Sequence, residues 1–196
     1  MNLKGVRPAR SRGYLTVTLV TEDGERESLT VSEEDYSTAG SPMARDEVGT
    51  REYLILKSSD EYYRARLSAL RMLSYGDNNR AALVRKLAAK GIGYECADAV
   101  AREMTSLGYI DEKKQLLNVV SREANVNLLG PRKIRAKLLA KGFKAADITS
   151  VIDELMASGE IDFERSAERL MAKKLARGAT DDEKKSLLYK NGYDIC

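Results

Sequence analysis

The sequence predicts a mainly α-helical protein of tandem three-helix repeats in an elongated array. The third repeat is truncated, and a small N-terminal α+β extension contains a β-hairpin. Two observations predict this fold. First, a segment of helical character occurs twice at an offset of 51 positions, with a weaker third copy after it. Second, apolar and polar residues alternate over residues 13–20, as they do in a strand. A fixed period of this length indicates units that stack because each is too small to bury its apolar face alone.

Strand-like alternation marks the extension, which we place at residues 1–58. Residues 1–12 are rich in arginine and are expected to be loose. Residues 13–20 carry apolar side chains at every second position, which predicts a strand with Leu15, Val17 and Leu19 on one face. The Glu-Asp-Gly sequence at 22–24 is typical of a hairpin turn, and residues 28–31 are predicted to form the returning strand.

Short helices are expected to complete the extension. Ser32 begins an N-cap signal, which predicts a helix to about residue 38. Residues 39–49 contain Gly, Ser and Pro and are the best linker candidate. A second short helix is predicted over residues 50–57, before a longer one over residues 59–75.

The first two repeats are predicted over residues 59–110 and 111–161. Each contains a helix with apolar side chains four positions apart, namely Leu83 and Leu87 in the first copy and Ile134 and Leu138 in the second. Both copies of this helix end in Lys-Gly, where glycine provides a left-handed C-cap and lysine complements the carbonyl end of the helix dipole. A second helix follows, and an Ile-Asp pair then caps the next helix.

A third, truncated repeat is predicted over residues 162–196. A capping box that starts at Thr180 predicts a helix that ends at Asn191-Gly192, and Gly192 lies 50 positions beyond Gly142. Only four residues follow Gly192, so we expect the last helix of this repeat to be missing.

Composition argues against several classes of function. The chain has no histidine, which argues against histidine general bases, Ser-His-Asp triads and most zinc sites. No convergent catalytic set is apparent, so we expect neither an enzyme nor a cofactor. No apolar run approaches the roughly 18 residues that span a bilayer, and the first residues lack a signal-peptide core. The expectation is a soluble cytoplasmic protein.

Basic side chains gather on the repeated helices. Residues 1–60 contain 8 Lys/Arg and 11 Asp/Glu, a charge balance of −3, whereas residues 61–196 contain 25 Lys/Arg and 19 Asp/Glu, a balance of +6. The solvated faces of amphipathic helices explain this excess almost as well as an anionic partner does. The basic set comprises Arg80, Arg85, Lys86, Lys90, Arg132, Lys133, Arg135, Lys137 and Lys141.

Repetition favours a binding role for this set. Lys86 and Lys90 recur as Lys137 and Lys141 at the same offset, and each pair is spaced i,i+4, so it shares a helix face. Stacked repeats would align these charges along one side, which suits a long anionic groove. Tyr75 and Tyr109 could stack on bases, but each lies beside apolar neighbours at a helix end, so we expect both to pack instead.

The sequence resembles the RecX family of recombinase modulators over about residues 50–194. The most specific points are Leu70-Arg-Met-Leu-Ser-Tyr75, Leu107-Gly-Tyr-Ile-Asp111 and Gly130-Pro-Arg-Lys-Ile-Arg135. The resemblance implies a non-enzymatic protein that binds the RecA–DNA filament along its groove and suppresses ATP hydrolysis and strand exchange. Where the family commonly has a basic residue and a serine cap, this chain has Gly76 and Asn79. Asparagine also caps helices.

The expected partner is therefore a RecA-type recombinase filament, with weak binding to single-stranded or duplex DNA, no membrane association and a monomeric chain. A helix-turn-helix DNA-binding regulator is the alternative, because three-helix units can present a recognition helix. That alternative requires base-reading side chains in the first turn of the repeated helix. The two copies begin differently, with Asn79-Arg-Ala-Ala in one and Gly130-Pro-Arg-Lys in the other, which does not indicate shared base readout.

Overall fold

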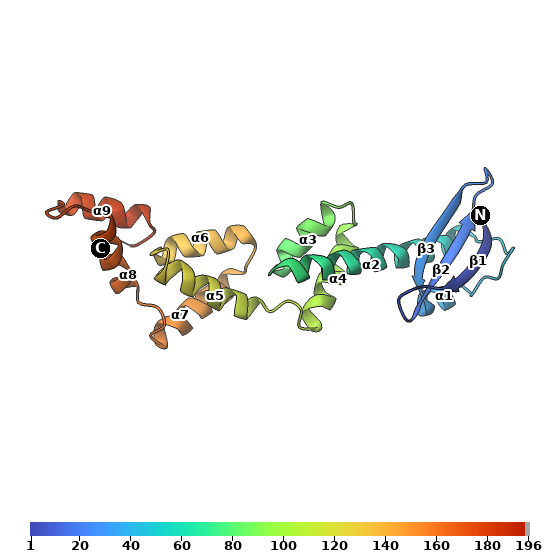
Figure 1. Ribbon diagram of the computed structural model, residues 1–196, viewed down its shortest axis with the longest axis horizontal. Coiled ribbons are helices and arrows are strands. Elements are labelled where there is room, and N and C mark those ends of the chain that lie inside the picture. The colour runs from blue at the N-terminus through green and yellow to red at the C-terminus, as the bar shows by residue number, and fades with distance from the viewer. Residues whose placement is uncertain (195–196) are drawn as a thin grey trace. The chain divides into compact units, whose positions relative to one another are not determined.

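The computed structural model describes residues 1–194, which form two compact units (Figure 1). Unit 1 comprises Met1–Gly76 and Leu83–Met104, and unit 2 comprises Asp77–Ala82 and the chain from Thr105 onward. Helices dominate, and one three-stranded antiparallel sheet lies in unit 1, so the predicted fold class is confirmed. Ile195 and Cys196, which end the repeat predicted at 162–196, lie outside the described residues.

The sheet contains β1 (Asn2–Pro8), β2 (Tyr14–Val20) and β3 (Arg26–Ser32) in that order. The β2–β3 pair is the predicted hairpin. The expectation that residues 1–12 are loose was wrong, because β1 pairs with β2 and buries Leu3. The register shifts between Leu3 and Gly5, and Pro8 ends the strand at the sheet edge, where proline is tolerated. This shift and the proline conceal the strand-like alternation.

Helices α1 (Glu33–Thr38) and α2 (Thr50–Tyr75) follow the sheet, and Ser32 caps α1 as predicted. The prediction of two helices over residues 50–75 was wrong, since α2 is continuous. Its polar residues Ser59 and Asp60 do not end the helix but face β3. Ser59 Oγ accepts the N–H of Ser32 at 3.0 Å, and Asp60 Oδ1 accepts the N–H of Thr30 at 2.8 Å. Side chains of α2 thus accept hydrogen bonds from backbone N–H groups on the outer edge of β3, which has no neighbouring strand among residues 1–194.

Unit 1 also contains most of α3 (Arg80–Ala88) and most of α4 (Tyr94–Ser106). Glu103 of α4 accepts hydrogen bonds from Tyr62 Oη at 3.0 Å and Arg66 Nε at 2.9 Å, both of α2. The predicted core residues Leu83 and Leu87 of α3 are fully buried.

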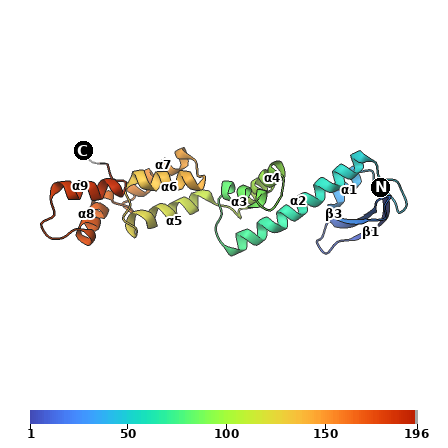
Figure 2. The same cartoon turned by 90° about the horizontal axis from the view of Figure 1, so that it is seen from above.

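In unit 2, α5 (Glu112–Asn125), α6 (Pro131–Lys141) and α7 (Ala145–Ala157) lie together in both views (Figures 1 and 2). Ile134 and Leu138 are buried in their shared core, as predicted. Helices α8 (Phe163–Lys174) and α9 (Asp181–Lys190) follow. They contribute to a smaller cluster, whose buried members are Leu128, Leu170 and Tyr193.

One turn ends the repeated helix in all three copies. The residue after the glycine donates its N–H to a carbonyl five positions back, in the pairs Ile92–Leu87, Phe143–Leu138 and Tyr193–Leu188. The intervening glycines have φ values of +83°, +95° and +88°, which a side chain would strain. The predicted Lys-Gly ending is therefore confirmed as a left-handed turn, although α3 stops at Ala88, before Lys90.

Candidate partner-binding surface

Three of the predicted cations lie on unit 1. Arg85 and Lys86 are exposed in the last turn of α3, and Lys90 is exposed in the turn that follows. Arg85 and Lys86 stand on the helix that buries Leu83 and Leu87, so one face of α3 packs while basic side chains meet solvent. This part of the set can meet an anionic partner.

The remaining cations lie on unit 2 and differ in their surroundings. Lys141 is exposed at the end of α6, whereas Arg80 and Arg135 are half-buried. Arg135 Nε is buried without a hydrogen-bond partner. Asn79 has the capping role expected of it, since its Oδ1 accepts the N–H of Ala82 at 2.7 Å.

Lys137 is bound within the protein. Its Nζ lies 2.7 Å from Oε1 of Glu123 on α5, and the Glu123 side chain is only 3% exposed. Asn127 Nδ2 donates to the other carboxylate oxygen at 2.8 Å. Burial alone would raise the pKa of Glu123, but the hydrogen bonds from Lys137 and Asn127 outweigh it and lower this pKa. Lys137 is thus the counter-ion of a buried carboxylate.

Arg132 and Lys133 are also engaged, although both are exposed. Arg132 Nη2 donates to the carbonyl of Tyr189 at 2.8 Å, and its guanidinium lies 4.0 Å from the centre of the Tyr189 ring. Lys133 Nζ donates to the carbonyl of Lys190 at 3.0 Å. Both cations therefore neutralise the carbonyl end of α9, where positive charge is favourable. Sequence spacing gave no sign of this contact, which joins residues 57 positions apart.

Sequence reasoning also missed Glu123, although a signal was present. Glu123 follows Leu116 and Val120 at helical spacing, so it lies on the buried stripe of α5. A lone acid on such a stripe indicates a buried pair, because an unpaired buried charge is costly.

The expectation that Tyr75 and Tyr109 pack against apolar neighbours was wrong. Tyr75 is 87% exposed and Tyr109 56% exposed. Tyr75 is the last residue of α2, and Ile110 takes the buried position beside Tyr109. Tyr94, at the start of α4, is 71% exposed as well. These rings are accessible to a partner.

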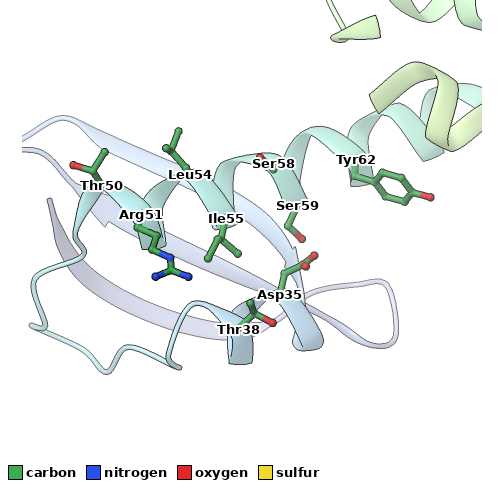
Figure 3. A pocket seen from close by; sticks show the side chains of 9 residues that line it. All are labelled: Asp35, Thr38, Thr50, Arg51, Leu54, Ile55, Ser58, Ser59 and Tyr62. Carbon is green, nitrogen blue, oxygen red and sulfur yellow. The ribbon is translucent and has the colours of Figure 1, made fainter. Parts of the chain in front are cut away.

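An open groove lies between α1 and α2 of unit 1 (Figure 3). Arg51, Ile55 and Ser59 point from α2 toward α1, where Asp35 and Thr38 face them. Asp35 accepts a hydrogen bond from Ser32 Oγ at 2.7 Å at the start of α1, so its carboxylate belongs to the helix cap. The nine residues that line the groove include no cysteine, so the groove has no thiol nucleophile.

Residues 1–194 contain neither a membrane-spanning helix nor a cluster of metal-ligating side chains. No helix in that range is long and apolar enough to cross a membrane. No group of three or more cysteine, aspartate or glutamate side chains there is arranged to hold a metal ion.

Comparison with known proteins reveals several relatives. No family model matches the chain. Regulatory protein RecX of Stenotrophomonas maltophilia is 30% identical over 131 residues, which cover 64% of this chain and 77% of that protein. Regulatory protein RecX of Thermus thermophilus is 37% identical over 86 residues, 44% of this chain and 58% of that one. A crystal structure of regulatory protein RecX matches with a TM-score of 0.72, covering 98% of this chain and 94% of that one; at 19% identity, this likeness concerns the fold.

Proposed function

Since this chain belongs to the RecX family of regulatory proteins, we propose that it regulates a RecA-type recombinase. It binds the recombinase–DNA filament along its groove and inhibits ATP hydrolysis and strand exchange, and so regulates recombination and DNA repair. Family membership is the observation that carries the proposal. The protein acts by binding rather than by catalysis, and it works in the cytoplasm as a monomer.

The exposed cations are the proposed contacts. Arg85, Lys86 and Lys90 of unit 1 and Lys141 of unit 2 are all exposed. Phosphates and acidic side chains of a filament attract such charges. Binding to phosphates releases their counter-ions, so it should weaken as the salt concentration rises. Tyr75 and Tyr94 are exposed on unit 1 and can stack on unpaired bases. Bare DNA is therefore expected to bind, though weakly.

Affinity for the assembled filament tests this function. The protein is titrated at one salt concentration into free recombinase, bare single-stranded DNA, bare duplex DNA and the filament assembled with a slowly hydrolysed ATP analogue. We expect the filament to bind at least about tenfold more tightly than any other form, a difference of about 1.4 kcal/mol. Equal affinity for bare duplex DNA and filament would contradict the proposal and favour the helix-turn-helix alternative.

Charge reversal tests the proposed contacts. We expect Lys86→Glu combined with Lys90→Glu and Lys141→Glu to raise the concentration that half-inhibits the recombinase ATPase by about tenfold or more, because three reversed charges repel an anionic partner. Lys137 is left unchanged, since it neutralises Glu123. Surface substitutions of this kind change folding little, so the circular dichroism spectrum should be retained.

A matched triple variant controls for total charge. Lys114, Lys144 and Lys185 are exposed and outside the predicted set. Reversing all three changes the net charge equally and should leave inhibition nearly intact. If both triple variants inhibit alike, the predicted set acts only as a solvated surface.

A further inference from the structure

At two places in unit 2, residues at the start of one copy of the repeated helix hydrogen-bond to the end of the next copy. At the first place, Asn79 caps α3 and also donates from Nδ2 to the carbonyl of Lys141, the last residue of α6, at 3.2 Å. At the second, the start of α6 meets the end of α9. There Gly130 N–H donates to Asn191 O at 2.8 Å, and Arg132 N–H donates to Gly192 O at 3.1 Å.

We call the second contact, formed by residues 130–133 and 189–193, the seam. Its backbones approach too closely for side chains. A Cβ on Gly130 would lie 2.4 Å from backbone atoms of Gly192 and Tyr193. A Cβ on Gly192 would lie 2.3 Å from Cβ of Lys133. Such distances require the backbones to separate, so glycine at both positions is a condition of this contact.

The seam satisfies two helix ends at once. The first N–H groups of a helix and its last carbonyls have no partners inside the helix. Here the N-terminal amides of α6 bond to carbonyls just past α9, and the side chains of Arg132 and Lys133 bond to the carbonyls of Tyr189 and Lys190. The opposite dipole ends of the two helices attract each other as well.

A buried tyrosine closes the seam. Tyr193 is 6% exposed, and its hydroxyl donates to the carbonyl of Leu128 at 3.1 Å. Leu128 has a positive φ of 54° in the loop before α6. Burial raises the pKa of Tyr193 to about 12, so this hydroxyl remains a donor at neutral pH. The cluster around it, with Leu170 of α8, ties both helices of the last repeat to the α5–α6 loop.

The two cations of the seam have no equivalents in the first repeat. At the offset of 51, Arg132 and Lys133 correspond to Ala81 and Ala82. The paired lysines recur at that offset, whereas these two cations do not. Arg132 and Lys133 therefore accompany the contact with α9 and are not part of the pattern that the repeats share.

We infer that Arg132 and Lys133 are positioning residues, which fix α8 and α9 on the preceding repeat through the seam and do not themselves contact the partner. Two members of the predicted binding set thereby have a different role, and the partner meets the last repeat in an orientation that the seam determines. The part of this inference that concerns the partner rests on the proposed function; the part that concerns the seam does not.

The test compares a charged and an uncharged way of opening the seam in the full chain. Arg132→Ala with Lys133→Ala removes the side-chain bonds, whereas Gly130→Ala inserts a methyl group without changing charge. Gly130 has φ −76°, which alanine adopts freely, so the only cost is the clash. Gly5→Ala is the matched control, because nothing lies within 4 Å of a Cβ there. Lys114→Ala with Lys144→Ala controls for the loss of two exposed charges.

Hydrogen exchange of the free chain is the first measurement. We expect amides of α8 and α9 to exchange at least about tenfold faster in both seam variants, with α7 unchanged, and neither control to show this effect. Unchanged exchange in the Arg132→Ala, Lys133→Ala variant would overturn the inference. This measurement needs no partner, so its outcome is independent of the proposed function.

The salt dependence of filament binding is the second measurement. If both cations act through the seam, both seam variants weaken binding similarly and keep the parent slope of log affinity against log salt concentration. If the cations contact phosphates directly, the double variant lowers that slope by about 1.5, and Gly130→Ala binds like the parent. The second pattern overturns the inference. Failure of the parent chain to bind any filament refutes the proposed function and leaves the exchange result standing.

Discussion

Replacing Lys137 with methionine is expected to lower the free energy of unfolding by about 2–3 kcal/mol, because it leaves a buried carboxylate without its cation. The Glu123 side chain is 3% exposed, and Lys137 is its closest cation, at 2.7 Å. Arg122 lies 3.9 Å away with a side chain that is 60% exposed, so it compensates little. The expected loss is smaller than for a fully buried pair because the Lys137 side chain is itself 45% exposed.

Urea unfolding followed by circular dichroism measures this loss, with two controls. Lys137→Arg keeps the charge near Glu123 and should retain most of the stability. Lys141→Met removes an exposed lysine one turn further along α6 and should change stability little. If Lys137→Met and Lys141→Met unfold at the same urea concentration, the ion pair contributes nothing.

The same pair predicts a pH dependence. Glu123 has a lowered pKa in the folded chain, so its contribution to stability is fully present above its ordinary pKa of about 4.3. Below that pH the carboxylate protonates in the unfolded chain first, and the contribution is lost as pH falls through the folded-state pKa. The parent should therefore lose stability on acidification more steeply than Lys137→Met. If the stability of the parent and that of Lys137→Met fall with equal slopes between pH 5 and pH 3, the lowered pKa of Glu123 does not come from Lys137.

Periodicity predicted the repeats because their signals are local. Apolar spacing, Lys-Gly endings and the Asp111 and Asp162 caps depend on a few neighbouring residues, and the structure confirms them. The strand β1 escaped prediction because a register shift and Pro8 break its alternation. The division of the chain into residues 1–58, 59–110, 111–161 and 162–196 remains a prediction.

The candidate site was harder to predict, since exposure depends on contacts distant in sequence. Lys137 neutralises a buried acid that is 14 residues away on α5, and the i,i+4 spacing of the lysines gives no sign of that acid. Arg132 reaches a carbonyl 57 positions ahead. Composition alone cannot separate such internal cations from those available to a partner. The exposed members of the set therefore remain the proposed contacts.

The second large effect is expected in unit 1, where Ser59 and Asp60 of α2 hold the edge of β3. Asp60→Leu together with Ser59→Ala should destabilise the sheet by about 3–5 kcal/mol, because the N–H groups of Thr30 and Ser32 lose their acceptors. Ser59 and Asp60 are each 6% exposed, so little water can replace their side chains. Unpaired amides on this edge also become a template for pairing with other strands.

Hydrogen exchange at Thr30 and Ser32 provides the measurement, and Arg64→Ala provides the control. Arg64 binds the other oxygen of Asp60 at 2.9 Å, but its side chain is 60% exposed, so its removal should cost less than about 1 kcal/mol. Asp60→Asn can keep an acceptor for the N–H of Thr30. Its exchange rate should therefore lie between those of the control and the double variant. We therefore expect exchange at both amides to increase strongly only when the acceptors are lost. If Arg64→Ala and the double variant exchange alike, the sheet is held by its apolar core with Leu56, and the helix side chains are not required.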